Sequence, residues 1–526
     1  MLLDKLTISG NYHRLISENN TGLIVSISAG GTSSLDAWVE VQHDCLILAR
    51  EPFGKFPLYW LQLPKVVWFA SHFQLLLPLI TPIVNTSALY GYSCFSYVPT
   101  PLTPVEGIYS VAAGTKQIFR GGESSSEVFY QWQTLPQISI NEDEAITQLP
   151  GLLKNSIERQ VADLPDEPVG VLLSGGLDSS IVAALLVQAG VKVRAYTLDF
   201  GAFGMPEYPY AAQVATHLHI PLIKVAATPR KIKAALVATV KALGLPFGDG
   251  VTVPLYLLCQ AASEETRIIF NGEGGDQLFA GWTNKPIIAA SVYNSEHPGG
   301  TADFTEQYLR TFRRLYGYES RVFQFGVGFD QPRTWIENAL DSSFSHNLMD
   351  RLRRATLMLK GAQNIHPRAT NLAFAHGLWV RSPFCDLPLA EWTFRLPGDL
   401  LLRGACEKYI LKRAVESWLP PDIVWREKRG MGVPLTEWCL GELWSMVGSW
   451  LNPGILLEEG RFLPQLPLQV ILGKLGGQIR GRRVGEILWL LIMWQVWRTH
   501  VLGEKPTRRS LNNPFYLPYW FWKFGH

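Results

Sequence analysis

The chain has 526 residues, more than one hydrophobic core usually serves, which predicts two or more domains. Hydrophobic residues make up 47% of it and charged residues 17%, a balance that excludes a disordered chain. Lys and Arg number 47 against 45 Asp and Glu, so the charge gives no reason to expect a nucleic acid or an acidic membrane as partner.

Cysteine usage and apolar runs favour a cytoplasmic protein. The six cysteines are scattered without a Cys-x-x-Cys pair, which predicts neither a disulfide framework nor a structural zinc site. The start of the chain shows no secretory pattern. The longest apolar run, residues 487–494, is too short to cross a bilayer and is expected to form a buried helix. We therefore expect no membrane partner.

The first elements are short β-type runs, such as residues 22–27 and 67–70, broken by Gly and Pro. Polar residues and prolines loosen this pattern between residues 131 and 140. We therefore predict a smaller domain over residues 1–135 and a larger one over 136–526.

Strand and helix patterns alternate in the second domain. Helices are expected over 144–159, with Pro150 as a potential break, and over 181–188 and 207–218; strands are expected up to residue 172 and over 193–197, 222–225 and 268–270. This rhythm predicts an α/β fold with a doubly wound parallel sheet and ligands at the carboxyl ends of its strands. From about residue 287 extra helices follow, and the aromatic tail at 515–522 is expected to dock on the core.

A glycine-rich loop, Ser174-Gly175-Gly176-Leu177-Asp178-Ser179-Ser180, lies between the strand that ends at 172 and the helix over 181–188. Glycines allow a tight turn close to an anion, and backbone N–H groups, the helix N-terminus and serine hydroxyls all favour phosphate. Asp178 would repel a triphosphate unless a divalent cation lay between them, which suggests a Mg²⁺ ligand. The alternative is an ordinary strand-turn-helix with an acidic residue near the helix start.

The loop resembles the pyrophosphatase loop of the asparagine synthetase family, whose members adenylate a carboxylate with ATP and then form an amide. Three later segments resemble that family in the same order: residues 271–279 (NGEGGDQLF), 377–386 (GLWVRSPFCD) and 408–428. The resemblance implies an ATP-pyrophosphatase synthetase domain that releases AMP and pyrophosphate.

The same resemblance implies roles for individual residues. Asp178 and Asp276 would hold Mg²⁺ on the phosphates, Lys428 would neutralise the leaving pyrophosphate, and Glu273 would orient the amine or take its proton. The nucleotide site would comprise Leu173, Ser174, Gly175, Gly176, Leu177, Asp178, Ser179, Ser180, Gly272, Gly274 and Gly275. The alternatives are a solvated lysine in a basic run for Lys428, and a polar turn beyond a buried strand for Glu273 and Asp276.

Two departures from the family pattern change the expected chemistry. Trp379 stands where the family has a Glu, and an indole cannot take a proton, so packing or a substrate wall is expected there. Leu2 stands where glutamine-dependent members have a nucleophilic Cys, although residues 46–54 and 57–59 resemble the later half of that domain. We expect a shortened, degenerate α+β domain resembling an N-terminal-nucleophile hydrolase, without glutamine as nitrogen source.

Three functions remain open at this point. The segment around Phe247-Gly248-Asp249 is similar to lasso-peptide macrolactam cyclases, which join an Asp or Glu side chain of a precursor peptide to its own N-terminal amine. A leader-binding protein and a protease would then be partners. The second reading is an ammonia-using ligase with a small amino-acid substrate. The third is a silent ATP-binding scaffold, against which the presence of Asp178, Glu273, Asp276 and Lys428 argues.

Overall fold

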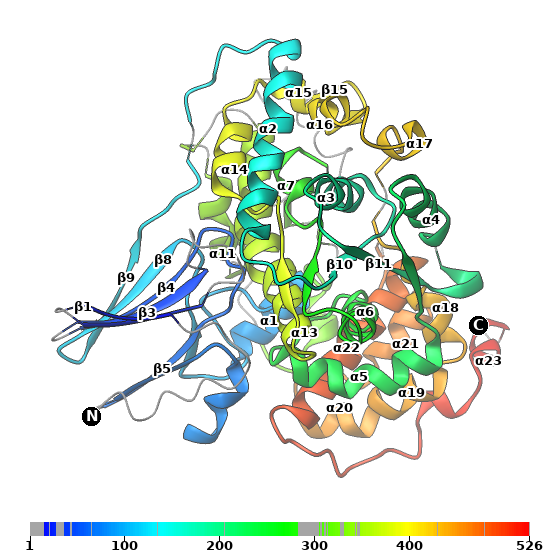
Figure 1. Cartoon of the computed structure of the whole chain (residues 1–526). Helices are drawn as coiled ribbons and strands as arrows, with labels where there is room; N and C mark the ends of the chain where they lie inside the picture. The colour runs from blue at the N-terminus through cyan, green and yellow to red at the C-terminus, as the bar shows by residue number, and fades with distance from the viewer. Residues whose placement is uncertain are drawn as a thin grey trace, which may run out of the picture.

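The computed structural model has a β-rich N-terminal part and a larger α/β part, at the left and right of Figure 1. It describes residues 15–19, 22–27, 36–42, 45–64, 66–133, 135–204, 206–281, 314–326, 331–341, 343–344, 348–428, 430–477 and 479–524, with residues 305, 308, 309 and 312.

The N-terminal part contains two antiparallel sheets that share a small core. The larger sheet has the order β1-β2-β3-β4-β8-β9 and the smaller one β6-β5-β7. The strands are β1 (Leu15–Asn19), β2 (Gly22–Ile27), β3 (Ala37–Gln42), β4 (Cys45–Arg50), β5 (Tyr59–Leu63), β6 (Val66–Ala70), β7 (Ile108–Ser110), β8 (Thr115–Arg120) and β9 (Glu123–Val128). Val39, Leu48, Leu58, Val111 and Phe119 pack together between the two sheets, which confirms the predicted β-rich domain.

The larger part is built on a parallel sheet of order β12-β11-β10-β13-β14. Its strands are β10 (Val169–Leu172), β11 (Val193–Asp199), β12 (Leu222–Ala226), β13 (Ile268–Phe270) and β14 (Trp379–Arg381). Ile268 and Phe270 belong to one hydrophobic core and the intervening Ile269 to another, so both faces of the sheet are buried. This arrangement confirms the predicted doubly wound fold.

Different helices cover the two faces of the parallel sheet. One core includes α2 (Glu142–Val161), α3 (Leu177–Gln188) and α4 (Tyr208–His217); the other includes α5 (Pro229–Leu243), α6 (Thr252–Ala262) and α13 (His366–Phe374). The potential break at Pro150 does not occur. A capping box between Asn141 and Glu144 starts α2, and buried Leu149 and Leu153 hold it on the core.

Most other elements of the described chain are helices, and in the C-terminal region this agrees with the prediction. The remaining elements are α1 (Thr86–Phe95), η2 (Phe73–Leu75), η3 (Leu77–Leu79), η4 (Gly201–Phe203), α7 (Gly275–Leu278), α10 (Glu319–Val322), α11 (Gln331–Leu340), α12 (Leu348–Ala355), η5 (Thr356–Ile365), α14 (Leu387–Phe394), α15 (Gly398–Leu401), β15 (Leu402–Arg403), β16 (Cys406–Glu407), α16 (Tyr409–Ala414), α17 (Pro421–Val424), α18 (Leu435–Leu440), α19 (Trp444–Trp450), α20 (Pro453–Glu459), α21 (Leu466–Ile471), α22 (Arg482–His500), η6 (Pro514–Tyr516) and α23 (Tyr519–Phe524).

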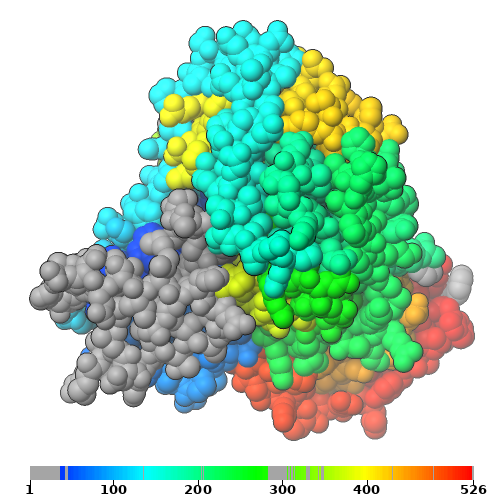
Figure 2. Space-filling view, in the orientation of Figure 1, coloured from blue at the N-terminus to red at the C-terminus, as the bar shows by residue number. Residues whose placement is uncertain are grey.

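Helix α22 contains the apolar run over 487–494, and every residue of that run is buried. It packs against α5, α18 and α21, and Figure 2 shows the orange and red C-terminal segments gathered at the bottom right beside green ones. Within the described residues, no helix is both long and apolar enough to span a membrane.

Helix α1 joins the N-terminal part to the large core. The Tyr92 hydroxyl donates to the carbonyl of Leu490 at 2.7 Å, and the Tyr90 hydroxyl donates to Glu319 at 2.7 Å. The two parts therefore share one core through α1. The described residues between β9 and α2 form neither helix nor strand, and the domain boundary at 135/136 stays a prediction.

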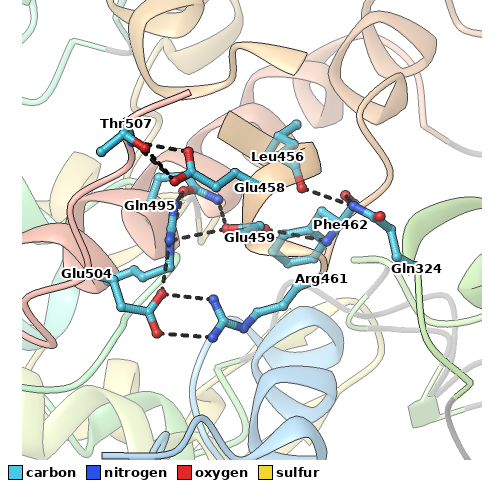
Figure 3. Close-up of polar contacts among 10 residues, drawn as sticks. Gln324, Leu456, Glu458, Glu459, Arg461, Phe462, Gln495, Glu504 and Thr507 are labelled. Carbon is cyan, nitrogen blue, oxygen red and sulfur yellow. Dashed lines mark hydrogen bonds and ion pairs between the residues drawn. The ribbon is translucent and has the colours of Figure 1, made fainter. Parts of the chain in front are cut away.

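A network of polar groups fastens the chain beyond α22 (Figure 3). Arg461 donates to both oxygens of Glu504 at 3.1 Å, and Glu458 accepts from the backbone nitrogen and hydroxyl of Thr507. Further along, the aromatic tail docks only in part. Phe515 is buried against Trp444, whereas Tyr516, Leu517, Trp520 and Phe521 are exposed.

Candidate active site

Two glycine-containing loops meet at the carboxyl edge of the parallel sheet. Residues 174–180 follow β10 and residues 271–276 follow β13, its parallel neighbour. A Cβ added at Gly272 would lie 2.7 Å from the backbone nitrogen of Ser179, and one at Gly275 would lie 2.5 Å from Asp178 Oδ1. Only glycine allows this approach, which places Asp178 beside Asp276.

Two lysines and two aspartates form a network, called here the active-site network: Asp178, Asp276, Lys408 and Lys428. Lys408 Nζ lies 2.5 Å from Asp178 Oδ2 and 2.5 Å from Asp276 Oδ1. Lys428 Nζ lies 2.7 Å from Asp276 Oδ2. The fold thus brings together the predicted Asp178, Asp276 and Lys428. The fold also brings in Lys408, for which the sequence indicates no role.

Burial and the lysines act in opposite directions on the two aspartates. Burial raises the pKa of Asp178, and Lys408 only partly opposes it. Burial would also raise the pKa of Asp276, but Lys408 and Lys428 together outweigh it and lower that pKa to about 2. Burial would lower the pKa of Lys428, and Asp276 and Asp178 reverse this and raise it. Asp276 and Lys428 are therefore charged at neutral pH.

The two aspartates suit a magnesium ion that arrives with phosphates. Asp178 Oδ1 is buried and has no hydrogen-bond partner among the described residues. Across the same residues, no group of three or more His, Cys, Asp or Glu could hold a metal by itself. Mg²⁺ commonly takes one or two carboxylates and completes its shell with water and phosphate oxygens. The donor set fits such an ion.

The serine hydroxyls of the first loop form hydrogen bonds within the loop itself. The hydroxyl of Ser180, which is fully buried, donates to the carbonyl of Gly176 at 2.8 Å and so supports the first turn of α3. Ser174 and Ser179 place their hydroxyl oxygens 3.1 Å apart at the loop. Ser179 Oγ also donates to the Gly176 carbonyl, at 3.1 Å, and Ser174 is the half-buried member of the three.

The other predicted loop residues are placed by packing. Leu173 is buried and Leu177 packs partly against the same core, so only their backbone could reach a nucleotide. Gly175 has a φ of +68°, and a Cβ there would lie 2.5 Å from the backbone nitrogen of Ala211 in α4. Gly176 directly precedes α3, where backbone N–H groups are free to face an anion.

Glu273 lies on the second loop, half-buried. Its backbone nitrogen donates to Asn271 Oδ1 at 3.1 Å, and the next residue, Gly274, has a φ of +102°. Burial raises the pKa of Glu273, against the lowering influence of Arg368. A carboxyl with a raised pKa is better able to exchange a proton near neutral pH.

Three further ionisable groups, Arg426, Glu207 and Lys408, lie near the first loop or its charged partners, and the sequence indicated no role for them. The guanidinium of Arg426 lies 3.4 Å from the centre of the Tyr210 ring, and its Nη1 donates to the carbonyl of Gly175. Burial raises the pKa of Glu207 to about 7 against Arg426 and Lys428. The third is Lys408, whose φ of +55° sets it before α16. No spacing in the sequence indicates that these groups meet the loop.

Trp379 begins β14 and packs edge-on against Phe374 at 5.2 Å. Phe56 and Ala37 of the N-terminal part belong to the same cluster. The indole therefore packs at the junction of the two parts, and a role as a substrate wall stays a prediction.

In the N-terminal segment that resembles a glutaminase, buried charged side chains form hydrogen bonds to the backbone that hold its loops in place. Arg50 donates to the carbonyls of Phe56 and Val111 at 2.6 Å, and Glu51 accepts from the backbone of Phe53 and Lys55. Leu2 is the position at which the sequence predicts that the nucleophilic cysteine is replaced. It lies outside the described residues.

Comparisons with known proteins agree with this geometry. The asparagine synthase family model matches residues 148–499, and the glutamine amidotransferase domain model matches residues 29–130.

Individual relatives cover most of the chain. Asparagine synthetase [glutamine-hydrolyzing] 1 of Bacillus subtilis is 23% identical over 492 residues, which cover 88% of this chain and 76% of that protein. A putative asparagine synthetase [glutamine-hydrolyzing] of Mycobacterium tuberculosis (strain H37Rv) is 24% identical over 526 residues, which cover 92% and 79%.

Solved structures give only a distant likeness. An NH3-dependent NAD synthetase from Campylobacter jejuni shares 13% identity and a TM-score of 0.20, and the match covers 39% of this chain and 95% of that one. Because the asparagine synthase model spans more than half of the sequence, the chain belongs to the asparagine synthase family and is an ATP-dependent, AMP-forming carbon–nitrogen ligase.

Proposed function

We propose that this ligase is a macrolactam cyclase of the lasso-peptide kind. It activates an Asp or Glu side chain of a precursor peptide and joins that carboxyl to the N-terminal amine of the same peptide. The observation that carries this proposal is the active-site network together with an N-terminal part whose described cysteines, Cys45 and Cys94, are both buried.

The cysteines of the described N-terminal part are poor nucleophiles. Cys45 and Cys94 are both buried, and burial raises the pKa of Cys94 well above its ordinary value. A thiol attacks as the thiolate, which a raised pKa disfavours. This supports an amine that comes from a substrate and not from glutamine hydrolysis at these residues.

In the first step, a carboxylate oxygen attacks the α-phosphorus of ATP, the bond to the β-phosphate breaks, and pyrophosphate leaves. Asp178 and Asp276 would hold Mg²⁺, which when bound shields the phosphate charge. Lys428 neutralises the negative charge that develops on pyrophosphate. Ser174 and Ser179 orient the phosphates from the loop.

In the second step, the amine attacks the activated carboxyl carbon, the bond from that carbon to the AMP oxygen breaks, and AMP leaves. Glu273 takes the proton from the amine nitrogen, which its raised pKa favours. Water must be kept out during this step, because it would hydrolyse the activated carboxyl.

The second candidate is a ligase that couples ammonia to a small amino acid. It is favoured by the names of the relatives, which are asparagine synthetases. The two candidates share the first step and differ in both acceptor and amine.

The test compares substrates on the full chain with ATP and Mg²⁺. One arm holds a candidate precursor peptide, with and without its leader-binding protein and protease; the other holds aspartate and ammonia. We expect AMP, pyrophosphate and a peptide product lighter by one water in the first arm only. Asparagine formation in the second arm, or glutamate release from added glutamine, contradicts the cyclase.

A further inference from the structure

A π-helix lies beside the active-site loops. Helix α12, the π-helical segment η5 and helix α13 follow one another without a break from residue 348 to 374. Both α12 and η5 contact α7, which carries Asp276. π-helical turns are rare and occur often at functional sites.

Contacts from α13 reach the loop that carries Glu273. The ring nitrogens of His366 lie 3.7 and 3.8 Å from Cys385 Sγ, and that sulfur lies 3.6 Å from the carbonyl oxygen of Glu273. The start of α13 is therefore one side chain away from the reacting loop.

Asp249 positions a buried arginine of α13. Asn364 Nδ2 donates to Asp249 Oδ2 at 2.6 Å, and Arg368 Nη1 donates to the same oxygen at 3.2 Å and to Asn364 Oδ1 at 3.3 Å. Arg314 Nη2 lies 3.4 Å from the other oxygen, Asp249 Oδ1. Arg368 is thus held through Nη1.

The Nε of the Arg368 guanidinium, on the side away from Nη1, is not satisfied by the described residues. Arg368 is 6% exposed, and its Nε has no hydrogen-bond partner in the part of the chain that the structure describes. Buried donors without partners are uncommon in native proteins, and a bound ligand, ion or water is one way in which such a donor is satisfied.

Two other arginines of the same helical run, Arg353 and Arg354, differ from Arg368 in their contacts with aromatic rings. The Nε atoms of Arg353 and Arg354 also lack hydrogen-bond partners among the described residues, but these guanidiniums lie over rings, at 4.1 Å from Phe394 and 4.6 Å from Phe344. The recorded polar partners of Arg368 are Asp249 and Asn364. Ring packing accounts for the first two arginines and not for Arg368.

Arg368 also acts on the reacting loop. Burial raises the pKa of Glu273, and Arg368 is the largest opposing influence, with the exposed Lys360 of η5 contributing in the same direction. Arg368 thus pairs with Asp249 at 3.2 Å and at the same time lowers the pKa of Glu273 against the effect of burial.

We propose that Arg368, positioned by Asp249 and Asn364, binds the acceptor carboxylate beside Glu273 through the Nε and Nη2 edge of its guanidinium. This edge matches the two oxygens of a carboxylate, which the point charge of a lysine does not. The inference rests on the proposed function for the identity of the ligand, the side-chain carboxylate of an Asp or Glu within a peptide.

The test measures binding of a small carboxylate to the full chain. The probe is radiolabelled N-acetyl-L-aspartate methylamide, followed by equilibrium dialysis with Mg²⁺ and α,β-methylene-ATP, which cannot release pyrophosphate. Arg368→Gln is expected to raise the Kd of the probe about tenfold to a hundredfold, and Arg368→Lys to recover only part of the loss. Arg354→Gln, a buried arginine of the same helical run, and the uncharged asparagine analogue of the probe are the controls.

Each outcome decides the matter. Equal Kd values for wild type and Arg368→Gln, or no binding of the probe to wild type, overturn the inference. A parallel loss of α,β-methylene-ATP affinity in Arg368→Gln also overturns it, because the role would then be structural. If Arg368→Gln fails to fold, Arg368→Lys decides by the same comparison. Wild type that binds the probe through Arg368 but forms no AMP from ATP and any carboxylate would refute the proposed function and leave this inference standing.

Discussion

Two buried networks of charge serve different purposes in this molecule. The active-site network joins Asp178 and Asp276 to Lys408 and Lys428. The second, called here the C-terminal network, consists of Glu459, Arg461, Gln495, Arg498 and Glu504. Figure 3 labels all of these except Arg498.

The two networks differ in whether protein groups satisfy their carboxylates. Both oxygens of Glu459 accept hydrogen bonds, from Phe462 and from Gln495, and Arg498 adds an ion pair at 3.2 Å. Asp178 keeps one buried oxygen without a partner among the described residues. Buried charges that are fully paired hold elements together, whereas an incompletely paired carboxylate is available to a ligand. Variants in the two networks should therefore separate activity from stability.

The largest effect is expected for Lys428→Met. Loss of its ammonium should lower the rate of AMP formation by about 10²- to 10³-fold, because the charge on pyrophosphate loses its partner. The thermal midpoint should change little, since Lys408 still pairs with Asp276 after the substitution. The measurement is pyrophosphate release beside a thermal melt. Retained activity would remove Lys428 from the proposed mechanism.

The reverse pattern is expected for Arg498→Met. This change leaves the fully buried carboxylate of Glu459 without its cation and should destabilise the fold by about 3–5 kcal/mol. The thermal midpoint falls, while kcat of the folded fraction stays within about twofold because the substrate is not contacted. The Glu459→Gln, Arg498→Met double variant should recover part of the loss. A fall in kcat at unchanged midpoint would show that the two networks are not distinct.

Lys408→Met should have an intermediate effect on both properties. Without the ammonium, Asp178 and Asp276 repel each other, and the fold should lose about 1–3 kcal/mol at neutral pH. Mg²⁺ should restore part of the thermal midpoint, since a cation again lies between the carboxylates. Melts with and without Mg²⁺, with Lys192→Met as exposed control, test this. An equal loss in both conditions would contradict a shared cation site.

Asp276 should give a modest pH-dependent effect. Its pKa is lowered from an ordinary 3.8 to about 2, so its stabilisation is present above pH 3.8 and is lost as the pH falls toward 2. With the side chain 32% exposed, screening reduces the expected contribution to about 1–2 kcal/mol at neutral pH. The stability difference between wild type and Asp276→Asn should thus shrink between pH 4 and pH 2, as measured by denaturant unfolding. A difference that stays constant over this range would contradict the ion pairing.

The smallest effect is expected for Arg482→Ala, outside both networks. Arg482 pairs with Glu486 four residues later, but its side chain is 78% exposed. Its loss should change stability by less than about 0.5 kcal/mol and leave AMP formation unchanged. A larger change in either measurement would mean that this basic edge of α22 has a role of its own.

Local patterns in the sequence predicted most of the framework. The strands β2 and β13 lie where short runs of apolar, β-type residues indicate them, and the glycine loop opens α3 directly after β10. The prediction at Pro150 was less successful. A proline at this position costs one backbone hydrogen bond, and the capping box and the buried leucines of α2 outweigh that loss.

The sequence predicted only part of the site, and the reason for this is physical. Asp178, Glu273, Asp276 and Lys428 each lie in a segment with a recognisable pattern. Lys408 lies 230 residues from Asp178 in sequence, and no periodicity reports that their side chains meet. Arg368 lies in a helical run whose π-helical turn has no signature in the sequence.

By itself, the sequence determined the two-part organisation, the parallel sheet and the glycine-rich loop between β10 and α3, because these follow from local periodicity, from glycine and from the chemistry of neighbouring residues. Only the tertiary structure decided which charges meet. It placed Lys408 between two aspartates, paired Arg498 with Glu459, and left the Nε of Arg368 without a partner among the described residues. Pairing of charges depends on distances between segments remote in the chain, and those distances exist only once the core has packed.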